Sequence, residues 1–194
     1  MKISFNSKII LMFSLLAFCV WFIDLFIKGF TTKYFVTTPD ISLTSFWSCF
    51  KLISHVLGHA NFDHLYSNLL LIILLGAGLE RVYGHGSMLF MIIITALIIG
   101  IVNAVIPFFS GNLLGASGVA FMFIALTPFL ADKEDGKIPI ECILVILLFG
   151  YKEISAAFQK DNIAQFAHLT GGACGLFFGF LFSKFGKKDL NDNS

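Results

Sequence analysis

Four polar side chains inside otherwise apolar segments carry the chemistry that this sequence could perform. Ser117 lies in a glycine-rich break between two long apolar runs, and the other three are His64, Asn68 and His168. Polar side chains are costly within membrane segments, tend to face the bundle interior and mark functional sites. Serine, imidazole and amide groups suit acyl transfer, in which the hydroxyl attacks a carbonyl group and a histidine removes its proton.

His168 is the better candidate for the general base. Gly171 and Gly175 follow it at i+3 and i+7, on one helix face. Glycines there let this segment approach the serine segment at Gly118, within hydrogen-bond reach of Ser117. No Asp or Glu lies near His168 in its segment, so the sequence permits a Ser/His dyad rather than a triad. The alternative role of His168 is an interhelical packing hydrogen bond.

His64 and Asn68 are spaced i, i+4 and share a helix face. With the backbone N–H of Ser117, their donors suit an oxyanion hole, because the start of a helix favours negative charge. Two alternatives remain open. Asn68 and His64 could bond across helices only for stability, and the cluster Gly115-Ala116-Ser117-Gly118 could serve only close helix packing.

His55, His59 and His64 raise the alternative of a metal site. The segment contains no HExxH motif, and Asp63 is the only carboxylate nearby. We therefore expect no metal and no cofactor, and predict that His55 and His59 form buried hydrogen bonds that fix the start of the second apolar segment. Glu80 and Arg81, at the other end of that segment, are interpreted as an interfacial ion pair.

The composition places the chain in a membrane. Of 194 residues, 57% are hydrophobic and only 13% are charged, so an integral membrane protein is predicted. The net charge of +1 gives no basic surplus, which argues against a nucleic-acid partner. The four cysteines form no CxxC pair and suggest neither a disulfide framework nor a zinc knuckle.

The elements that must position these residues are six apolar segments of roughly membrane-spanning length. We expect an all-α integral membrane fold, a single domain over residues 1–194, with helices at about 9–27, 62–80, 87–107, 116–131, 138–157 and 166–183. The first segment is too long for a signal peptide and is expected to be retained. The loop 28–57 is long enough to be partly structured, with Phe46, Trp47 and Phe50 as interface anchors.

The distribution of Lys and Arg favours cytoplasmic termini. Eight basic residues fall on the side of the termini and five on the other side: Lys2, Lys8, Arg81, Lys133, Lys137, Lys184, Lys187 and Lys188 against Lys28, Lys33, Lys51, Lys152 and Lys160. In that topology His64, Asn68, Ser117 and His168 lie near the outer ends of three different helices. The site would then open to the outer side.

Taken in order, these motifs resemble those of the rhomboid intramembrane serine proteases. The matching pieces are His55-x3-His59-x4-His64-x3-Asn68, Gly78-Leu79-Glu80-Arg81-Val82-Tyr83-Gly84, Gly115-Ala116-Ser117-Gly118 and Ala167-His168-Leu169-Thr170-Gly171-x3-Gly175. The resemblance runs from about Phe50 to Phe185. It implies a six-helix bundle with Ser117 as nucleophile, His168 as base, and His64, Asn68 and the Ser117 amide as the oxyanion hole.

The chain departs from the family pattern at three places. Phe50-Lys51 stands where an aromatic-arginine pair is expected, which keeps the charge and loses the guanidinium fork. Phe121 replaces a Tyr that stacks on the histidine, so a ring remains and a hydroxyl is lost. Phe166 is bulkier than the small residue often found there. These departures bear on substrate preference more than on catalysis.

The resemblance implies an intramembrane serine endopeptidase that cleaves single-span membrane proteins within the lipid bilayer through an acyl-enzyme. The few helices and lack of appended domains lead us to expect a bacterial cytoplasmic membrane. One alternative is a catalytically silent rhomboid-like protein that binds transmembrane helices, although neither Ser117 nor His168 is missing. A small transporter would need a charged pathway at mid-membrane, and only Asp24, near a helix end, offers that.

Overall fold

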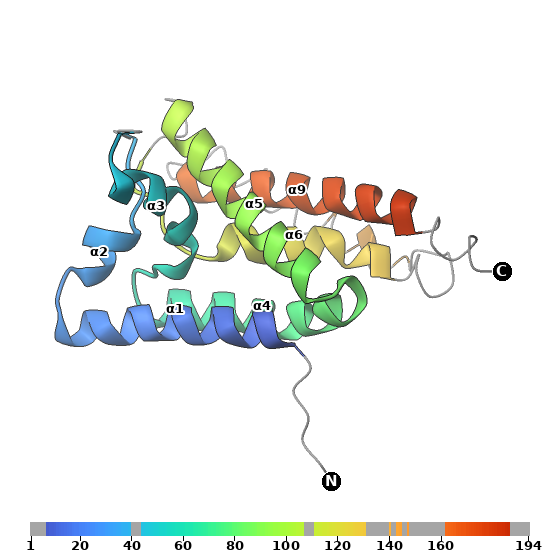
Figure 1. Ribbon diagram of the computed structural model, residues 1–194, viewed down its shortest axis with the longest axis horizontal. Coiled ribbons are helices and arrows are strands. Elements are labelled where there is room, and N and C mark those ends of the chain that lie inside the picture. The colour runs from blue at the N-terminus through green and yellow to red at the C-terminus, as the bar shows by residue number, and fades with distance from the viewer. Residues whose placement is uncertain are drawn as a thin grey trace, which may run out of the picture.

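The described part of the chain is all-helical. The computed structural model describes residues 7–39, 44–106, 111–130 and 162–186, with the single positions 140, 143–144 and 147. The elements are α1 (Lys8–Phe26), α2 (Phe30–Phe35), α3 (Phe46–Ser54), the 3-10 turn η1 (His55–Leu57), α4 (Phe62–Tyr83), α5 (His85–Val105), α6 (Ser117–Leu126) and α9 (Asn162–Gly186) (Figure 1). Within these residues the one β-type pairing is an isolated bridge between Thr37 and Leu113.

Among the described residues, four helices are long and apolar enough to cross a membrane: residues 8–26, 62–83, 85–105 and 165–183. They match four of the six predicted segments to within a few residues. The fourth predicted segment, 116–131, is a shorter apolar helix over 117–130, in which regular α6 ends at Leu126 just before Pro128. Proline removes a backbone donor and restrains the residue before it. The fifth segment, 138–157, lies largely outside the described residues.

Helix α6 runs beside α9 and also packs against α4 and α5 (Figure 1). Every residue of α6 is buried except Ser117 and Phe121, which are half-buried. Those two positions are spaced i, i+4 and therefore share one face. The helix is thus enclosed by the bundle on all sides except the face that carries the predicted nucleophile.

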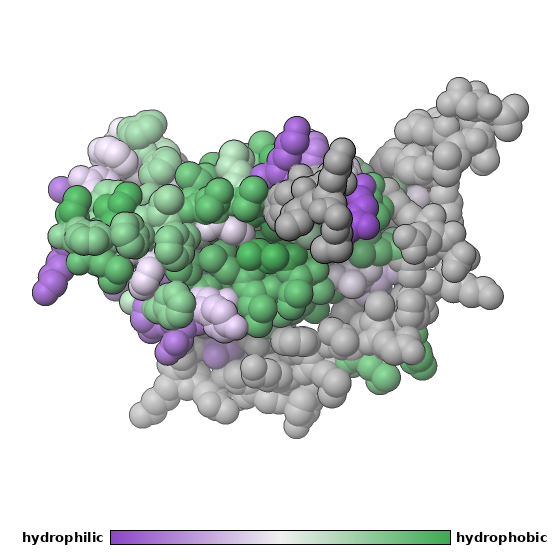
Figure 2. All heavy atoms as spheres, turned by 90° about the horizontal axis from the view of Figure 1, so that it is seen from below, coloured by the Kyte–Doolittle hydropathy of each residue, from purple (hydrophilic) through white to green (hydrophobic). Residues whose placement is uncertain are grey.

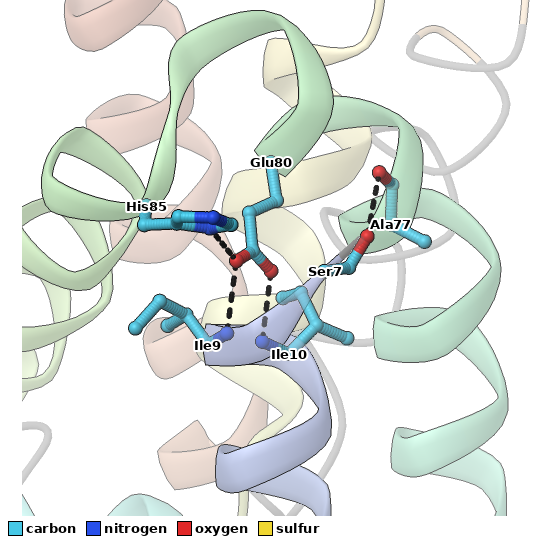
Figure 3. A network of polar contacts seen from close by, with 6 residues as sticks. All are labelled: Ser7, Ile9, Ile10, Ala77, Glu80 and His85. Atoms are coloured by element: carbon cyan, nitrogen blue, oxygen red, sulfur yellow. Dashed lines mark hydrogen bonds and ion pairs between the residues drawn. The ribbon is translucent and has the colours of Figure 1, made fainter. Parts of the chain in front are cut away.

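Glu80 fastens α1 to α4 (Figure 3). Its buried carboxylate accepts hydrogen bonds from the backbone N–H groups of Ile9 (2.8 Å) and Ile10 (2.9 Å), and from Nδ1 of the half-exposed His85 (2.5 Å). The first turn of a helix has unpaired N–H groups and a positive end, so it suits a carboxylate. The predicted ion pair with Arg81 is wrong, because adjacent helical residues point in different directions and Arg81 is exposed.

The first loop is partly structured, as predicted: it contains α2, α3 and η1. Asp24 accepts a hydrogen bond from the Thr31 N–H at 2.6 Å, at the start of α2. This role for Asp24 removes the one charged group that suggested a transport pathway. Phe46 and Trp47 are exposed on α3, as interface anchors would be.

The outer surface of the spanning helices is strongly apolar. Phe26, Leu74 and Phe180 are 74%, 67% and 66% exposed. Figure 2 shows apolar side chains over much of the described surface on one face. Apolar surface of this extent marks contact with another apolar medium, and helices of this length indicate the lipid bilayer.

Candidate functional site

Residues 115–116, which precede Ser117 and are called the serine loop here, are held by His55 and His59. The N–H of Gly115 donates to the backbone carbonyl of His55 (2.9 Å), and the N–H of Ala116 donates to Nε2 of His59 (3.3 Å). Gly115 has a φ of +115°, a conformation that favours glycine. Helix α6 then begins at Ser117, so the amide of Ser117 belongs to the first turn, where N–H groups lack intrahelical partners.

His168 lies against the serine helix. Its ring stacks on Phe121, with 4.2 Å between ring centroids and 8° between planes. The aromatic contact expected at this position is therefore present without the tyrosine hydroxyl. Because Phe121 lies one helical turn after Ser117, the imidazole covers the same face of α6 that carries the serine.

Glycines allow the close approach of α9 to α6. A Cβ on Gly171 would overlap the backbone carbonyl of Gly118, and one on Gly175 would overlap that of Met122. Conversely, a Cβ on Gly118 would lie 3.1 Å from the carbonyl oxygen of Ala167, the residue before His168. The two backbones meet at the level of the serine and the histidine.

His64 and Asn68 face the serine loop from α4. A Cβ on Gly115 would lie 2.8 Å from Nε2 of His64 and 3.7 Å from Nδ2 of Asn68. Asn68 is buried, and its Nδ2 has no hydrogen-bond partner. Buried donors in proteins are nearly always paired, so this amide can donate to a group that lies beside the serine loop.

The structure places His64 and Asn68 beside Gly115, and His168 beside Phe121. His64 is near the start of α4, Ser117 is the first residue of α6, and His168 is in the second turn of α9. His64 also lies within electrostatic range of His168. Residues of α4 and α9 therefore approach the N-terminal end of α6.

The predicted buried hydrogen bonds of His55 and His59 are confirmed: both residues are buried, and their rings bond to the backbone carbonyls of Leu52 and Leu57. The two residues also hold residues 115–116, through the backbone carbonyl of His55 and Nε2 of His59. The start of α4 is capped by Asn61, whose Oδ1 accepts from the His64 N–H at 2.8 Å. The contacts with residues 115–116 were not predicted, because spacing along the chain does not reveal contacts with a loop more than fifty residues away. The Asn61 cap has a sequence signal, since Asn is a favoured residue immediately before a helix.

Burial keeps both histidines neutral. It lowers the pKa of His55 to about 4, against hydrogen bonds to the Lys51 and Leu52 carbonyls that raise it. Burial also lowers the pKa of His59 to about 4, and the neighbouring His64 adds to the effect. Within the described ranges no group of three His, Cys, Asp or Glu side chains could hold a metal ion.

Comparison with known proteins agrees with this geometry. A family model described as a rhomboid domain matches residues 45–185. The chain is also similar to the rhomboid protease GlpG of Haemophilus influenzae, with 30% identity over 145 residues, which are 72% of this chain and 73% of that protein. Together with the membrane-length helices, these matches support an integral membrane protease. Since the matched residues make up well over half of its length, the chain belongs to the rhomboid family.

Proposed function

We propose that this chain is an intramembrane serine endopeptidase that cleaves transmembrane or juxtamembrane segments of membrane proteins, with Ser117 as nucleophile and His168 as general base. One observation carries the proposal. Helix α6 is buried except at Ser117 and Phe121, and the ring of His168 stacks on Phe121. Ser117 is therefore partly exposed, and it lies on the same face of α6 as the ring of His168.

The reaction follows from these roles. The Ser117 hydroxyl attacks the carbonyl carbon of the peptide bond while His168 takes its proton. The tetrahedral intermediate collapses when His168 returns that proton to the leaving amine, which breaks the C–N bond and leaves an ester on Ser117. Water, deprotonated by His168, then attacks the ester. The ester C–O bond breaks as His168 returns the proton from water to the Ser117 oxygen. The products are the amine released in the first step, a carboxylic acid and the regenerated serine.

The oxyanion hole consists of His64, Asn68 and the backbone amide of Ser117. The negative charge on the carbonyl oxygen develops only in the intermediate, so donors already fixed in place stabilise it without reorganisation. Two features support this assignment. The Asn68 amide lacks a protein partner, and the Ser117 amide is at the positive end of α6.

The remaining parts of the proposal concern the setting. The domain has six spanning helices in a bacterial cytoplasmic membrane, with cytoplasmic termini and a site that opens to the outer side. The substrates are single-span membrane proteins, which reach the site from the bilayer. The reaction requires no cofactor, because serine and histidine complete every proton transfer.

The test compares purified wild type with Ser117→Ala and His168→Ala in liposomes, using a labelled single-span substrate with and without a chelator. We expect the wild type to cleave equally in both conditions, and each variant to lose at least about a thousandfold in kcat. Cleavage that survives Ser117→Ala would rule out the mechanism. Binding of the substrate by wild type without cleavage would favour the catalytically silent helix-binding protein.

A further inference from the structure

His59 is a buried histidine that takes no part in the chemistry proposed above, yet it contacts the serine loop. Its side chain is 3% exposed, and its Nε2 accepts the N–H of Ala116, the residue before Ser117. Its Nδ1 lies 3.3 Å from the Leu57 carbonyl oxygen. The ring therefore bridges the end of the first loop and the start of α6.

These two contacts fix the tautomer of His59. A backbone N–H can only donate, so Nε2 must be the unprotonated nitrogen. The Leu57 carbonyl can only accept, so Nδ1 must carry the proton. The lowered pKa of His59, about 4, keeps the ring in this neutral form at physiological pH.

The tautomer matters because the loop at Ala116 has little freedom. Gly115, one residue earlier, is already tied to the His55 carbonyl and lies against the His64 ring. Ala116 is completely buried, so its N–H group cannot form a hydrogen bond with solvent. Without an acceptor at Nε2, that buried donor would be left unsatisfied, and reorienting the peptide would avoid this cost.

We propose that His59 is a positioning residue for acyl transfer: by accepting the Ala116 N–H, it holds the peptide before Ser117 so that the next amide faces the oxyanion. The inference rests on the proposed function. His59 touches neither the substrate nor the reacting atoms. It acts through the backbone of residues 115–117, in which a shift of one peptide would misplace both the nucleophile and one oxyanion donor.

Two variants of similar polarity separate this role from simple core packing. In His59→Gln the side-chain oxygen replaces Nε2, so an acceptor for the Ala116 N–H remains. In His59→Asn the side-chain amide replaces Nδ1, so only the donor to the Leu57 carbonyl remains. A packing histidine would be replaced equally well, or equally poorly, by both.

The experiment measures kcat and KM in liposomes for wild type, His59→Gln, His59→Asn and Ser117→Ala, with thermal unfolding of each. We expect His59→Gln to keep kcat within about threefold and His59→Asn to lose roughly 10- to 100-fold, with KM nearly unchanged in both. Equal kcat values for the two variants, or losses that follow the unfolding temperature, would overturn the proposal.

Hydrogen exchange at the Ala116 amide supplies a readout that needs no catalysis. Exchange should accelerate in His59→Asn and stay slow in His59→Gln, and equal protection in the two variants would contradict the assigned hydrogen bond. If cleavage survives Ser117→Ala, the proposed function fails, whatever the exchange result. If cleavage depends on Ser117 but kcat is the same in both His59 variants, only the positioning role fails.

Discussion

At the scale of single residues, a substitution of Asn68 should change the activity without lowering the stability. Its buried Nδ2 has no partner in the protein, so its removal breaks no internal hydrogen bond. We expect Asn68→Leu to keep or raise the unfolding temperature, because a buried unsatisfied amide is replaced by an apolar group of similar size. The same substitution should lower kcat by about 10²- to 10³-fold through loss of an oxyanion donor.

The control for Asn68 is the neighbouring Ser67, an exposed residue whose hydroxyl donates to the carbonyl of His64 at 3.1 Å. Ser67→Ala should change neither quantity appreciably. The measurements are kcat in liposomes and thermal unfolding in detergent. If Asn68→Leu lowered stability and kcat together, the amide would instead be holding α4 in place.

The two buried histidines predict a loss of stability in acid. The pKa values of His55 and His59 are about 4 in the folded protein, against 6.5 for an ordinary histidine. Between these values the unfolded chain binds more protons, so stability is complete above pH 6.5 and falls as pH decreases towards 4. Each histidine contributes at most about 3 kcal/mol.

Thermal unfolding measured from pH 7.5 to 4.5 checks this prediction. The wild type should lose stability over that range, and His59→Gln should lose less, because it lacks one of the two titrating groups. Parallel curves for the two proteins would show that His59 does not titrate during unfolding.

At the scale of elements, the contact between α6 and α9 depends on which glycine is substituted. Gly171 lies against the backbone of Gly118, whereas the position of a Cβ on Gly172 is open. Gly171→Ala should push the helices apart, with a cost of about 1–3 kcal/mol and a lower kcat. Gly172→Ala should be neutral or stabilise by up to about 1 kcal/mol through helix propensity. Kinetics and thermal unfolding of this adjacent pair give the comparison, and equal effects would contradict the packing described.

The attachment of α1 to α4 depends on the charge of Glu80. Glu80→Gln replaces one of the two carboxylate oxygens, which accept from Ile9, Ile10 and His85, by an N–H₂ group that cannot accept, so at least one of these donors loses its acceptor and we expect a loss of about 2–3 kcal/mol. The adjacent Arg81→Gln is the control, and since Arg81 is exposed its effect should stay within about 0.5 kcal/mol. Thermal unfolding in detergent measures both. A larger effect of Arg81→Gln would restore the ion pair that the sequence suggested.

At the scale of the whole molecule, the sequence predicted what depends on composition and local spacing. The long spans over 8–26, 62–83 and 85–105 follow from runs of apolar residues, and the i, i+4 spacing places His64 and Asn68 on one face. The roles of Glu80 and His59 could not be predicted in this way. Their partners, Ile10 and Ala116, are 70 and 57 residues away, and backbone N–H groups carry no sequence signal.

The orientation of the bundle in the membrane gives the last prediction. Helix α4 is 22 residues long, about 33 Å, and so carries the residue before its start and the turn after its end to opposite membrane surfaces. Ala60 precedes α4, and Gly86 follows it; both are exposed. With Cys19, Cys49, Cys142 and Cys174 replaced, Ala60→Cys and Gly86→Cys supply one thiol each.

A membrane-impermeant maleimide added to intact cells should label Ala60→Cys, whereas Gly86→Cys should react only after lysis. The reason is the excess of Lys and Arg, eight against five, on the side that carries Arg81 and the termini. Since His64 lies in the first turn of the same helix, four residues after Ala60, external labelling of Ala60→Cys would also place the serine site towards the outer surface. The reverse pattern would put the site on the cytoplasmic side and require substrates cut near their cytoplasmic ends.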